Sequence, residues 1–357
     1  MDSVNTKITK ETKTKIRVDY EGKLSFKERL YQKVKASNTW IKIVVNIFRF
    51  ILMLGVSFVI LHPFITKIAG SFMTKEDVID ATVAVIPKNF TFDQYKYIAI
   101  ENGYAEALLN TTLLSLFCAI IQTLMACLIG YGLAKFKFKG NSFVMGLVIF
   151  TMVIPHGTMK PSMIRHFANF DFLKIQVFDY RGIIDLISGG NQLDLLDTFW
   201  PLIILSIFGL AFKNGLYIYL MRQFFKGVPD ELEESAYVDG SGVFRTFFQI
   251  ILPLSIPMMI TIFLFSFSWQ WTDEFYASLF LPAMEGSEAK VYMMPDVYQL
   301  VYQMPIVKAK EGTAGITVYK NVIQNTAGMM IIMPLIIMYL FCQKYLVQGI
   351  ERSGLVG

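Results

Sequence analysis

The sequence has few of the residues from which reactive and metal-binding centres are built. Of its 357 residues only three are cysteine and three are histidine, and 17% are charged, against about 25% in ordinary soluble domains. The cysteines lie inside apolar stretches, so we expect small core side chains and no disulfide framework. The histidines show no ligand spacing and no acidic companion in register, so we expect no metal site. These six residues are Cys118, Cys127, Cys342, His62, His156 and His166.

A phosphate-binding loop is also missing from the sequence. No G-x-x-x-x-G-K-[ST] stretch occurs, and GYGLAKF at 130–136 is typical of a glycine-containing helix end beside a basic loop. We therefore do not expect the chain to bind ATP by itself or to hold another cofactor. The residues of a membrane enzyme, a nucleophile with its base or a metal constellation, cannot be assembled either, so we expect no catalytic residues.

Long apolar stretches dominate what is present. Hydrophobic residues make up 54% of the chain and aromatic residues 15%. Stretches near the roughly 20 residues that cross a bilayer recur along it, so we expect an all-α integral membrane protein. A polar tail at 1–42 is followed by one membrane domain at 43–357. Six transmembrane helices are expected in that domain, at 43–65, 108–134, 143–164, 199–221, 250–271 and 324–343.

The lysines and arginines predict how these helices are oriented. The tail and the connections on its side of the membrane hold 19 of them in 92 residues, whereas the opposite connections hold 11 in 128. By the positive-inside rule, both termini are cytoplasmic. The tail is expected to be solvated, to lie against anionic membrane lipid and to contain no cleavable signal peptide. It accounts for the net charge of +5, so we infer no nucleic-acid partner.

Two features inside the predicted spans have two interpretations each. Pro155, Pro161 and Pro334 interrupt helices, which is typical of helices that surround a cavity or move, and equally of ordinary kinks. Lys213 lies inside the fourth span, where a charge indicates a functional site. Snorkelling of its side chain towards the cytoplasmic interface is the alternative that we favour.

The segment 229–253 reads PDELEESAYVDGSGVFRTFFQIILP. Its early carboxylates favour a short helix over 229–238, and Gly240 and Gly242 predict a bend. A helical run resumes at Val243 and enters the fifth span through Pro253. From these residues alone, a re-entrant loop that seals the helix bundle and a rigid docking element for a partner fit equally well. The resumed run is expected to present one aromatic face, formed by Phe244, Phe247, Phe248 and Ile251.

The spacing of this segment resembles the EAA motif in the membrane subunits of ATP-binding-cassette importers, which is E-A-A, three residues, G, nine residues, I-x-L-P. Serine replaces the first alanine here, a change between small residues. Three stretches resemble the maltose-type carbohydrate branch: LYIYLMRQFFKGVPDELEESAYVDG, QWTDEFYASLFL and CQKYLVQGIERSGLVG. The likeness covers about residues 45–357, although 170–198 is longer than usual. The motif positions are Glu234, Ser235, Ala236, Asp239, Gly240, Ile250, Leu252 and Pro253.

The resemblance implies the type I permease fold of these importers. It implies a subunit that moves a carbohydrate, an oligosaccharide by preference, into a prokaryotic cell through the cytoplasmic membrane by ATP-driven alternating access. The loop 229–253 would then be the cytoplasmic coupling helix, with Glu234 contacting an ATPase and Gly240 permitting the bend. The implied partners are a second homologous permease, which makes a heterodimer, two cytoplasmic ATPases that hold ATP and Mg²⁺, and an extracellular solute-binding protein.

Candidates for the substrate path lie at the outer end of the fifth span and are Trp269, Trp271, Asp273 and Glu274. Aromatic faces and polar groups bind sugars, but an aromatic belt at the membrane interface explains the tryptophans at least as well. The loop at 282–323 is positioned like the family's external loop that meets the binding protein. An importer permease for a non-sugar solute remains an alternative. A secondary carrier without an ATPase is disfavoured, because several intramembrane acids and repeated broken helices are lacking.

Overall fold

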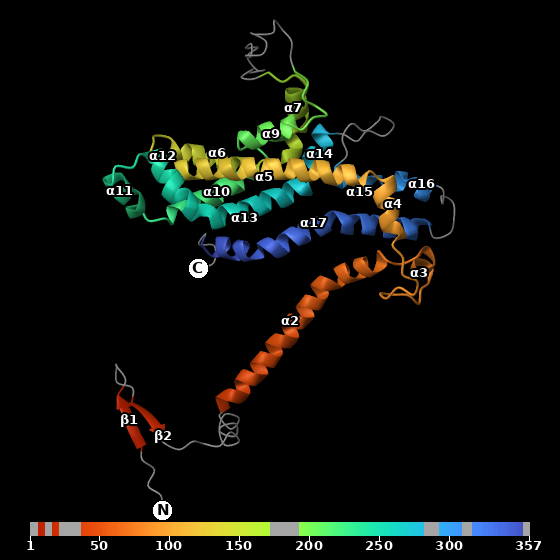
Figure 1. Cartoon of the computed structure of the whole chain (residues 1–357), viewed down its shortest axis with the longest axis horizontal. Coiled ribbons are helices and arrows are strands. Elements are labelled where there is room, and N and C mark those ends of the chain that lie inside the picture. Colours follow the sequence, from red (N-terminus) through yellow and green to blue (C-terminus); the bar gives the residue numbers. More distant parts are fainter. Residues whose placement is uncertain are drawn as a thin grey trace, which may run out of the picture. The chain divides into compact units, whose positions relative to one another are not determined.

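The computed structural model describes residues 6–10, 16–20, 37–171, 193–281, 293–308 and 316–352. The chain divides into two compact units, Met1–Thr66 and Lys67–Gly357, which are described separately (Figure 1). Most of the predicted tail at 1–42 lies outside the described residues. The same holds for parts of the predicted external connections at 165–198 and 272–323.

The first unit contains a hairpin and most of a long helix. Strands β1 (Thr6–Lys10) and β2 (Ile16–Tyr20) pair antiparallel with Ile8 opposite Val18. No strand was expected in the tail, so the hairpin corrects the sequence analysis. Alternating β-branched residues in both short segments account for it. Helix α2 (Ser37–Gly70), whose last residues belong to the second unit, contains the first predicted span, and its apolar side chains are exposed.

In the described parts of the second unit the regular secondary structure is helical, apart from two isolated β-bridges. Short helices connect longer ones, and the segment between α11 and α13 includes one π-helical turn. In chain order these elements are α3 (Lys75–Ile79), α4 (Asp93–Glu101), α5 (Tyr104–Lys135), α6 (Asn141–Val153), α7 (His156–Ala168), α9 (Trp200–Ile207), α10 (Asn214–Lys226), α11 (Glu231–Val238), α12 (Val243–Thr246), η2 (Phe247–Ile251), α13 (Leu252–Trp271), α14 (Phe275–Phe280), α15 (Met294–Gln299), η3 (Leu300–Gln303), α16 (Pro305–Lys308) and α17 (Ile316–Arg352).

Within the described residues, four helical segments are long and apolar enough to cross a membrane: Trp40–Gly70, Tyr104–Lys135, Val243–Trp271 and Ile316–Leu346. They contain the first, second, fifth and sixth predicted spans. The third predicted span consists of α6 and α7, which are bent by 101°, and counting this pair as one span gives five. The bend lies at Ile154 and Pro155. Ile154 is extended, with ψ at 125°, because a following proline disfavours helical backbone.

The fourth predicted span, 199–221, was wrong as one continuous helix. The segment contains α9, of 8 residues, and α10, which starts at Asn214. Between them the chain breaks at Gly209 and Lys213, with φ of 68° and 67°. The break was hidden because the connecting residues are themselves mostly apolar, so hydropathy alone does not separate two short helices from one span.

Helix α5 lies at the centre of the second unit and packs against α9, α10 and α13 (Figure 1). Two glycines allow helices to approach closely. A Cβ atom at Gly130 would lie 2.6 Å from the Cβ of Met221, and one at Gly215 would lie 2.7 Å from Oγ1 of Thr151. Small residues at helix contacts are the usual means of tight packing in membranes. The predicted core positions of Cys118 and Cys127 are confirmed, since both are buried.

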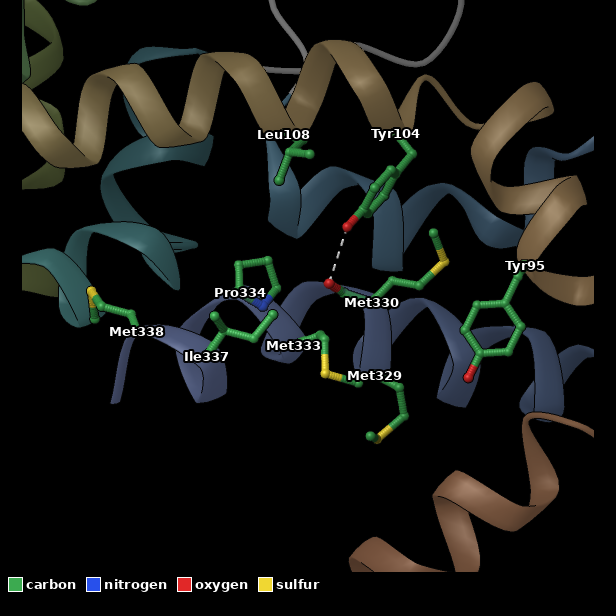
Figure 2. A pocket seen from close by; sticks show the side chains of 9 residues that line it. All are labelled: Tyr95, Tyr104, Leu108, Met329, Met330, Met333, Pro334, Ile337 and Met338. Atoms are coloured by element: carbon green, nitrogen blue, oxygen red, sulfur yellow. Dashed lines mark hydrogen bonds between the residues drawn. The ribbon is translucent and has the colours of Figure 1, made fainter. Parts of the chain in front are cut away.

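An apolar groove of about 570 Å³ runs along α17 beside α5 (Figure 2). Pro334 has no N–H, so the Met330 carbonyl, four residues earlier, loses its helical donor. The Tyr104 hydroxyl donates to that oxygen over 3.2 Å. A neighbouring helix thus satisfies the freed group, which favours the kink interpretation of Pro334. The groove is lined by Tyr95, Tyr104, Leu108, Met329, Met330, Met333, Pro334, Ile337 and Met338.

Candidate functional site

Helix α11 contains the first half of the motif and ends at a glycine in the left-handed conformation. Gly240 has φ of +81°. Its N–H donates to Tyr237 O over 3.0 Å, and the Ser241 N–H donates to Ala236 O over 2.9 Å. These two bonds form a Schellman motif, in which a left-handed glycine satisfies the last helical carbonyls. Among the described residues, no atom lies within 4 Å of a Cβ built on Gly240. Glycine is therefore required here by the backbone conformation and not by a lack of space for a side chain.

The two faces of α11 differ in exposure. Ala236 and Glu233 are buried, whereas Glu234 and Ser235 are exposed, and the Ser235 hydroxyl donates to Leu232 O over 3.1 Å. Asp239 follows the helix as an exposed residue. The exposed face therefore presents one motif carboxylate and a small residue, next to the apolar side chains of Leu232, Tyr237 and Val238.

The end of α5 holds the start of α11. The Lys135 ammonium donates to Val228 O over 2.7 Å, is paired with Asp230 over 2.5 Å, and lies 3.8 Å from Oε1 of Glu233. The Tyr131 hydroxyl donates to the other Glu233 oxygen over 3.4 Å. The side chains of Lys135 and Glu233 are 7% and 11% exposed, so this pair is enclosed between the two helices, whereas the Asp230 side chain is exposed. The sequence analysis missed Lys135 and Tyr131, because nothing in a basic helix end identifies its distant partners.

Burial and charge act in opposite directions on the two carboxylates of this cluster. Burial raises the pKa of Glu233 above its ordinary value, although the Lys135 ammonium opposes the rise. The hydrogen bond from Lys135 lowers the pKa of the exposed Asp230. Glu233 is thus an inward-facing anchor of α11, whereas the motif carboxylates Glu234 and Asp239 are exposed to a partner.

The second half of the motif starts α13 after a π-helical turn. The Leu252 N–H donates to Phe247 O across η2, and Pro253 lies in the first turn of α13. A proline in that first turn costs no helical hydrogen bond. Ile250 and Leu252 are both partly buried, and they pack against the core cluster that contains Phe247 and Ile251. The predicted aromatic face was wrong as one surface: Phe247 and Ile251 are buried, but Phe244 and Phe248 are exposed, because the π-helical turn shifts the helical repeat.

The four substrate-path candidates separate into different environments. Trp271 is 1% exposed and its indole N–H donates to Ile331 O over 3.0 Å, so it joins α13 to α17 as a core residue. Trp269 is 45% exposed, and Asp273 lies beside it on the wall of a small polar cavity. Glu274 is exposed before α14. The structure therefore brings Trp269 and Asp273 together and places Trp271 in the core.

The polar cavity lies between α5, α13 and the α9–α10 break. Its volume of about 10 Å³ is room for about one water. Gln122 crosses it, donating to the Ser206 hydroxyl over 3.0 Å and accepting from the Ser266 hydroxyl over 2.6 Å. The sequence analysis did not single out these residues, although a glutamine inside an apolar span was a visible signal. The cavity is lined by Gln122, Phe212, Ser266, Trp269, Gln270 and Asp273.

Asp273 has one satisfied and one unsatisfied oxygen. Oδ1 accepts the Tyr276 N–H over 3.0 Å and so caps the start of α14. Oδ2 is buried and has no hydrogen-bond partner among the residues that the structure describes. Burial raises the pKa of Asp273 to about 6, while the backbone N–H groups of α14 oppose the rise.

Comparison with known families locates these features in one domain. Residues 122–352 match the model of the "Binding-protein-dependent transport system inner membrane component" family. The chain belongs to this family. The match includes both the segment 229–253 and the polar cavity. It makes the protein a multi-pass permease of the cytoplasmic membrane that works with a solute-binding protein.

Relatives of this permease are similar over most of their length. The polygalacturonan/rhamnogalacturonan transport system permease protein YtcP of Bacillus subtilis is 29% identical over 317 residues, which is 87% of this chain and 97% of that protein. The maltodextrin transport system permease protein MalD of Streptococcus pneumoniae is 27% identical over 85% of this chain and 93% of its own.

A solved structure shares the permease fold. A bacterial ABC transporter involved in the import of the acidic polysaccharide alginate contains a chain that superposes with a TM-score of 0.59 at 20% identity, covering 90% of this chain and 98% of that one. At this identity the likeness supports the fold. The expected type I importer permease fold is thereby confirmed for the membrane domain.

Proposed function

We propose that this protein is the membrane-spanning permease subunit of an ATP-binding-cassette importer that moves a carbohydrate into the cell by alternating access. According to their names, the relatives described above belong to a polygalacturonan/rhamnogalacturonan transport system and a maltodextrin transport system. A galactooligosaccharide permease, GanQ of Bacillus subtilis, is also similar, at 26% identity over 87% of the chain. An oligosaccharide is therefore the substrate class that the comparisons favour.

The observation that carries the coupling role is the form of α11. It is a short rigid helix, stopped by Gly240, with Glu234 on its exposed face and Glu233 tied to the end of α5. A partner ATPase that pushes on the exposed face would move α5, because Lys135 joins the two helices. Helix α5 carries Gln122 into the polar cavity, so the push would reach the substrate path along one continuous helix. Coupling of this kind needs a permease with two arrangements that both sites bias.

The remaining components follow from this role. Two cytoplasmic ATPases would bind ATP and Mg²⁺, a second homologous permease would complete the path as a heterodimer, and the chain itself would perform no chemistry. Both termini and the loop 229–253 would face the cytoplasm. The tail and the connections on its side of the membrane together hold 19 lysines and arginines in 92 residues, against 11 in 128 on the opposite side, which supports this orientation.

The test is uptake of labelled oligosaccharides by proteoliposomes that contain the complete importer, with its second permease, ATPases and binding protein. We expect uptake that requires ATP on the side of the membrane where the ATPases lie. Uptake should stop when the ATPases are inactivated. Uptake that continues with inactive ATPases and follows an ion gradient would contradict the proposal and identify a secondary carrier.

A further inference from the structure

The α6–α7, α9–α10 and α13–α14 breaks lie close together beside the polar cavity. Aromatic rings from all three breaks pack against one another there. Phe212 lies in the α9–α10 break, and its ring centroid is 5.5 Å from that of Trp269 on α13 and 4.8 Å from that of His156 at the start of α7. His156 Nδ1 is hydrogen-bonded to the Tyr276 hydroxyl over 2.9 Å. Irregular backbone at membrane depth is tolerated where it is enclosed by protein or lines a cavity. The cluster is thus positioned like a binding surface.

Two lysines lie over the rings of this cluster. The Lys213 ammonium is 4.7 Å from the centroid of Phe212 and 5.0 Å from that of Trp269. The Lys160 ammonium is 4.6 Å from the centroid of Phe275. Among the residues that the structure describes, neither ammonium is in an ion pair with a carboxylate. Cation–π contacts compensate only part of the hydration that an ammonium loses, so both lysines retain capacity for an anion.

The backbone adds positive potential at the same place. Helices α7 and α10 both start in the cluster, at His156 and Asn214, and neither has a side-chain cap at its first turn. Helix N-termini favour anions. By contrast, the first turn of α14 is capped by Asp273, whose Oδ1 accepts the Tyr276 N–H. The carboxylate that lines the cavity is therefore already bonded to a helix N-terminus. Lys213 itself is held with φ of 67°, an uncommon conformation for a residue other than glycine, and this places its ammonium over both rings.

We propose that Lys213 and Lys160, with the ring faces of Phe212, Trp269 and Phe275, form a binding site for oligosaccharides that carry carboxylates, the oligouronates. The half-exposed Trp269 ring would stack on the apolar face of a pyranose unit, and each lysine would bind one carboxylate. Since the two ammonium groups lie over different rings, they suit charges spaced along a sugar chain better than one compact anion such as phosphate. This proposal rests on the carbohydrate-importer function proposed above and replaces the snorkelling interpretation of Lys213.

The test uses the purified complete importer without its binding protein, so that the selectivity of the binding protein does not enter. Oligogalacturonate and oligomannuronate are titrated by calorimetry, each beside its neutral counterpart in which the carboxyls are reduced to alcohols. We expect tighter binding of at least one oligouronate than of its neutral counterpart. Lys213→Met and Lys160→Met should each weaken that binding about tenfold or more, because each removes a charge-assisted hydrogen bond, and Lys213→Arg should retain most of it.

A matched control is Lys320→Met, because Lys320 lies over the Tyr302 ring, 5.3 Å from its centroid, outside the cluster. It should leave oligouronate binding unchanged. Equal affinity of the wild type for acidic and neutral sugars would overturn the proposed site. So would a loss of affinity in Lys213→Met and Lys160→Met that is as large for the neutral sugar as for the acidic one. ATP-driven uptake of neutral oligosaccharides alone by the importer with its binding protein would overturn only this proposal, whereas failure to take up any sugar would contradict the proposed function.

Discussion

Lys135, the last residue of α5, lies 3.8 Å from Glu233 on α11, and both side chains are enclosed. This contact joins the segment that resembles a coupling helix to the central helix of the membrane domain. From the sequence, this segment was expected to continue into the fifth span through Pro253. The ion pair of Lys135 with Glu233 links it to α5 as well. Several measurements follow from this arrangement.

Lys135→Met should weaken the contact between α11 and α5. It leaves the buried Glu233 carboxylate without its cation, at a cost of about 1–3 kcal/mol, so we expect a lower thermal stability and loss of coupled uptake. Lys135→Met combined with Glu233→Gln should recover stability, because no buried charge is left unpaired. Thermal unfolding and substrate-stimulated ATP hydrolysis measure the two effects. An additive loss in the double variant would refute the pairing.

Gly240→Val should abolish uptake while the protein stays in the membrane. The left-handed φ of Gly240 costs about 1–2 kcal/mol for a residue with a Cβ atom, and a β-branched side chain would displace the end of α11. Gly240→Asn should retain part of the activity, since asparagine tolerates this conformation. Gly242→Val is the matched control, because Gly242 has φ of −79° and open space around it. If both valine variants failed equally, the conformational argument would be wrong.

Glu234→Lys should abolish uptake without lowering the stability of the permease. Glu234 is exposed on α11, so its replacement removes a contact for the ATPase and leaves the core intact. Glu231→Lys introduces the same charge on another exposed position of the helix and should be milder. Co-purification of the ATPase with each variant measures docking. Normal ATPase binding and uptake in Glu234→Lys would remove this residue from the interface.

Asp273→Asn should stabilise the protein at neutral pH. The pKa of Asp273 is raised from 3.8 to about 6, so the folded state binds more protons than the unfolded state between these values. The free energy of unfolding therefore falls by about 3 kcal/mol as pH rises from about 4 to 6, and it stays low at higher pH. Asparagine keeps an oxygen that caps α14 and carries no charge. The melting temperature of Asp273→Asn minus that of the wild type should thus be larger at pH 7.5 than at pH 4.5, and Glu274→Gln, at an exposed site, should show no such difference.

Gly130→Val should destabilise the contact between α5 and α10. A Cβ at this position would lie 2.6 Å from Met221 Cβ, and overpacking of this kind costs about 1–3 kcal/mol. Gly132→Val, two residues away with no atom within 4 Å of its Cβ, is the matched control. Thermal unfolding of the purified variants compares them. Equal stability of the two would show that α10 can move away without cost.

Four predicted spans, the short helix before Gly240 and the glycine stop itself were predictable because each depends on local chemistry. Uninterrupted apolar length predicts a span, and a glycine after acidic helical residues predicts a helix end. The α9–α10 break was not predictable in this way, since mostly apolar residues on both sides of Gly209 fit one span or two short helices equally. The aromatic face failed for a related reason: one π-helical turn before Pro253 separates Phe244 and Phe248 from the buried Phe247.

The sequence by itself determined that this is a helical membrane protein, and its EAA spacing pointed to the permease family. The tertiary structure decided which carboxylate of α11 faces inward, which tryptophan of α13 remains exposed, and which rings lie beside the Lys213 ammonium. Those outcomes depend on contacts between residues far apart in the chain, such as Lys135 with Glu233 and Trp271 with Ile331. Burial of an ionisable or aromatic group follows from which helices pack around it, and the spacing of residues along one helix does not specify its neighbours.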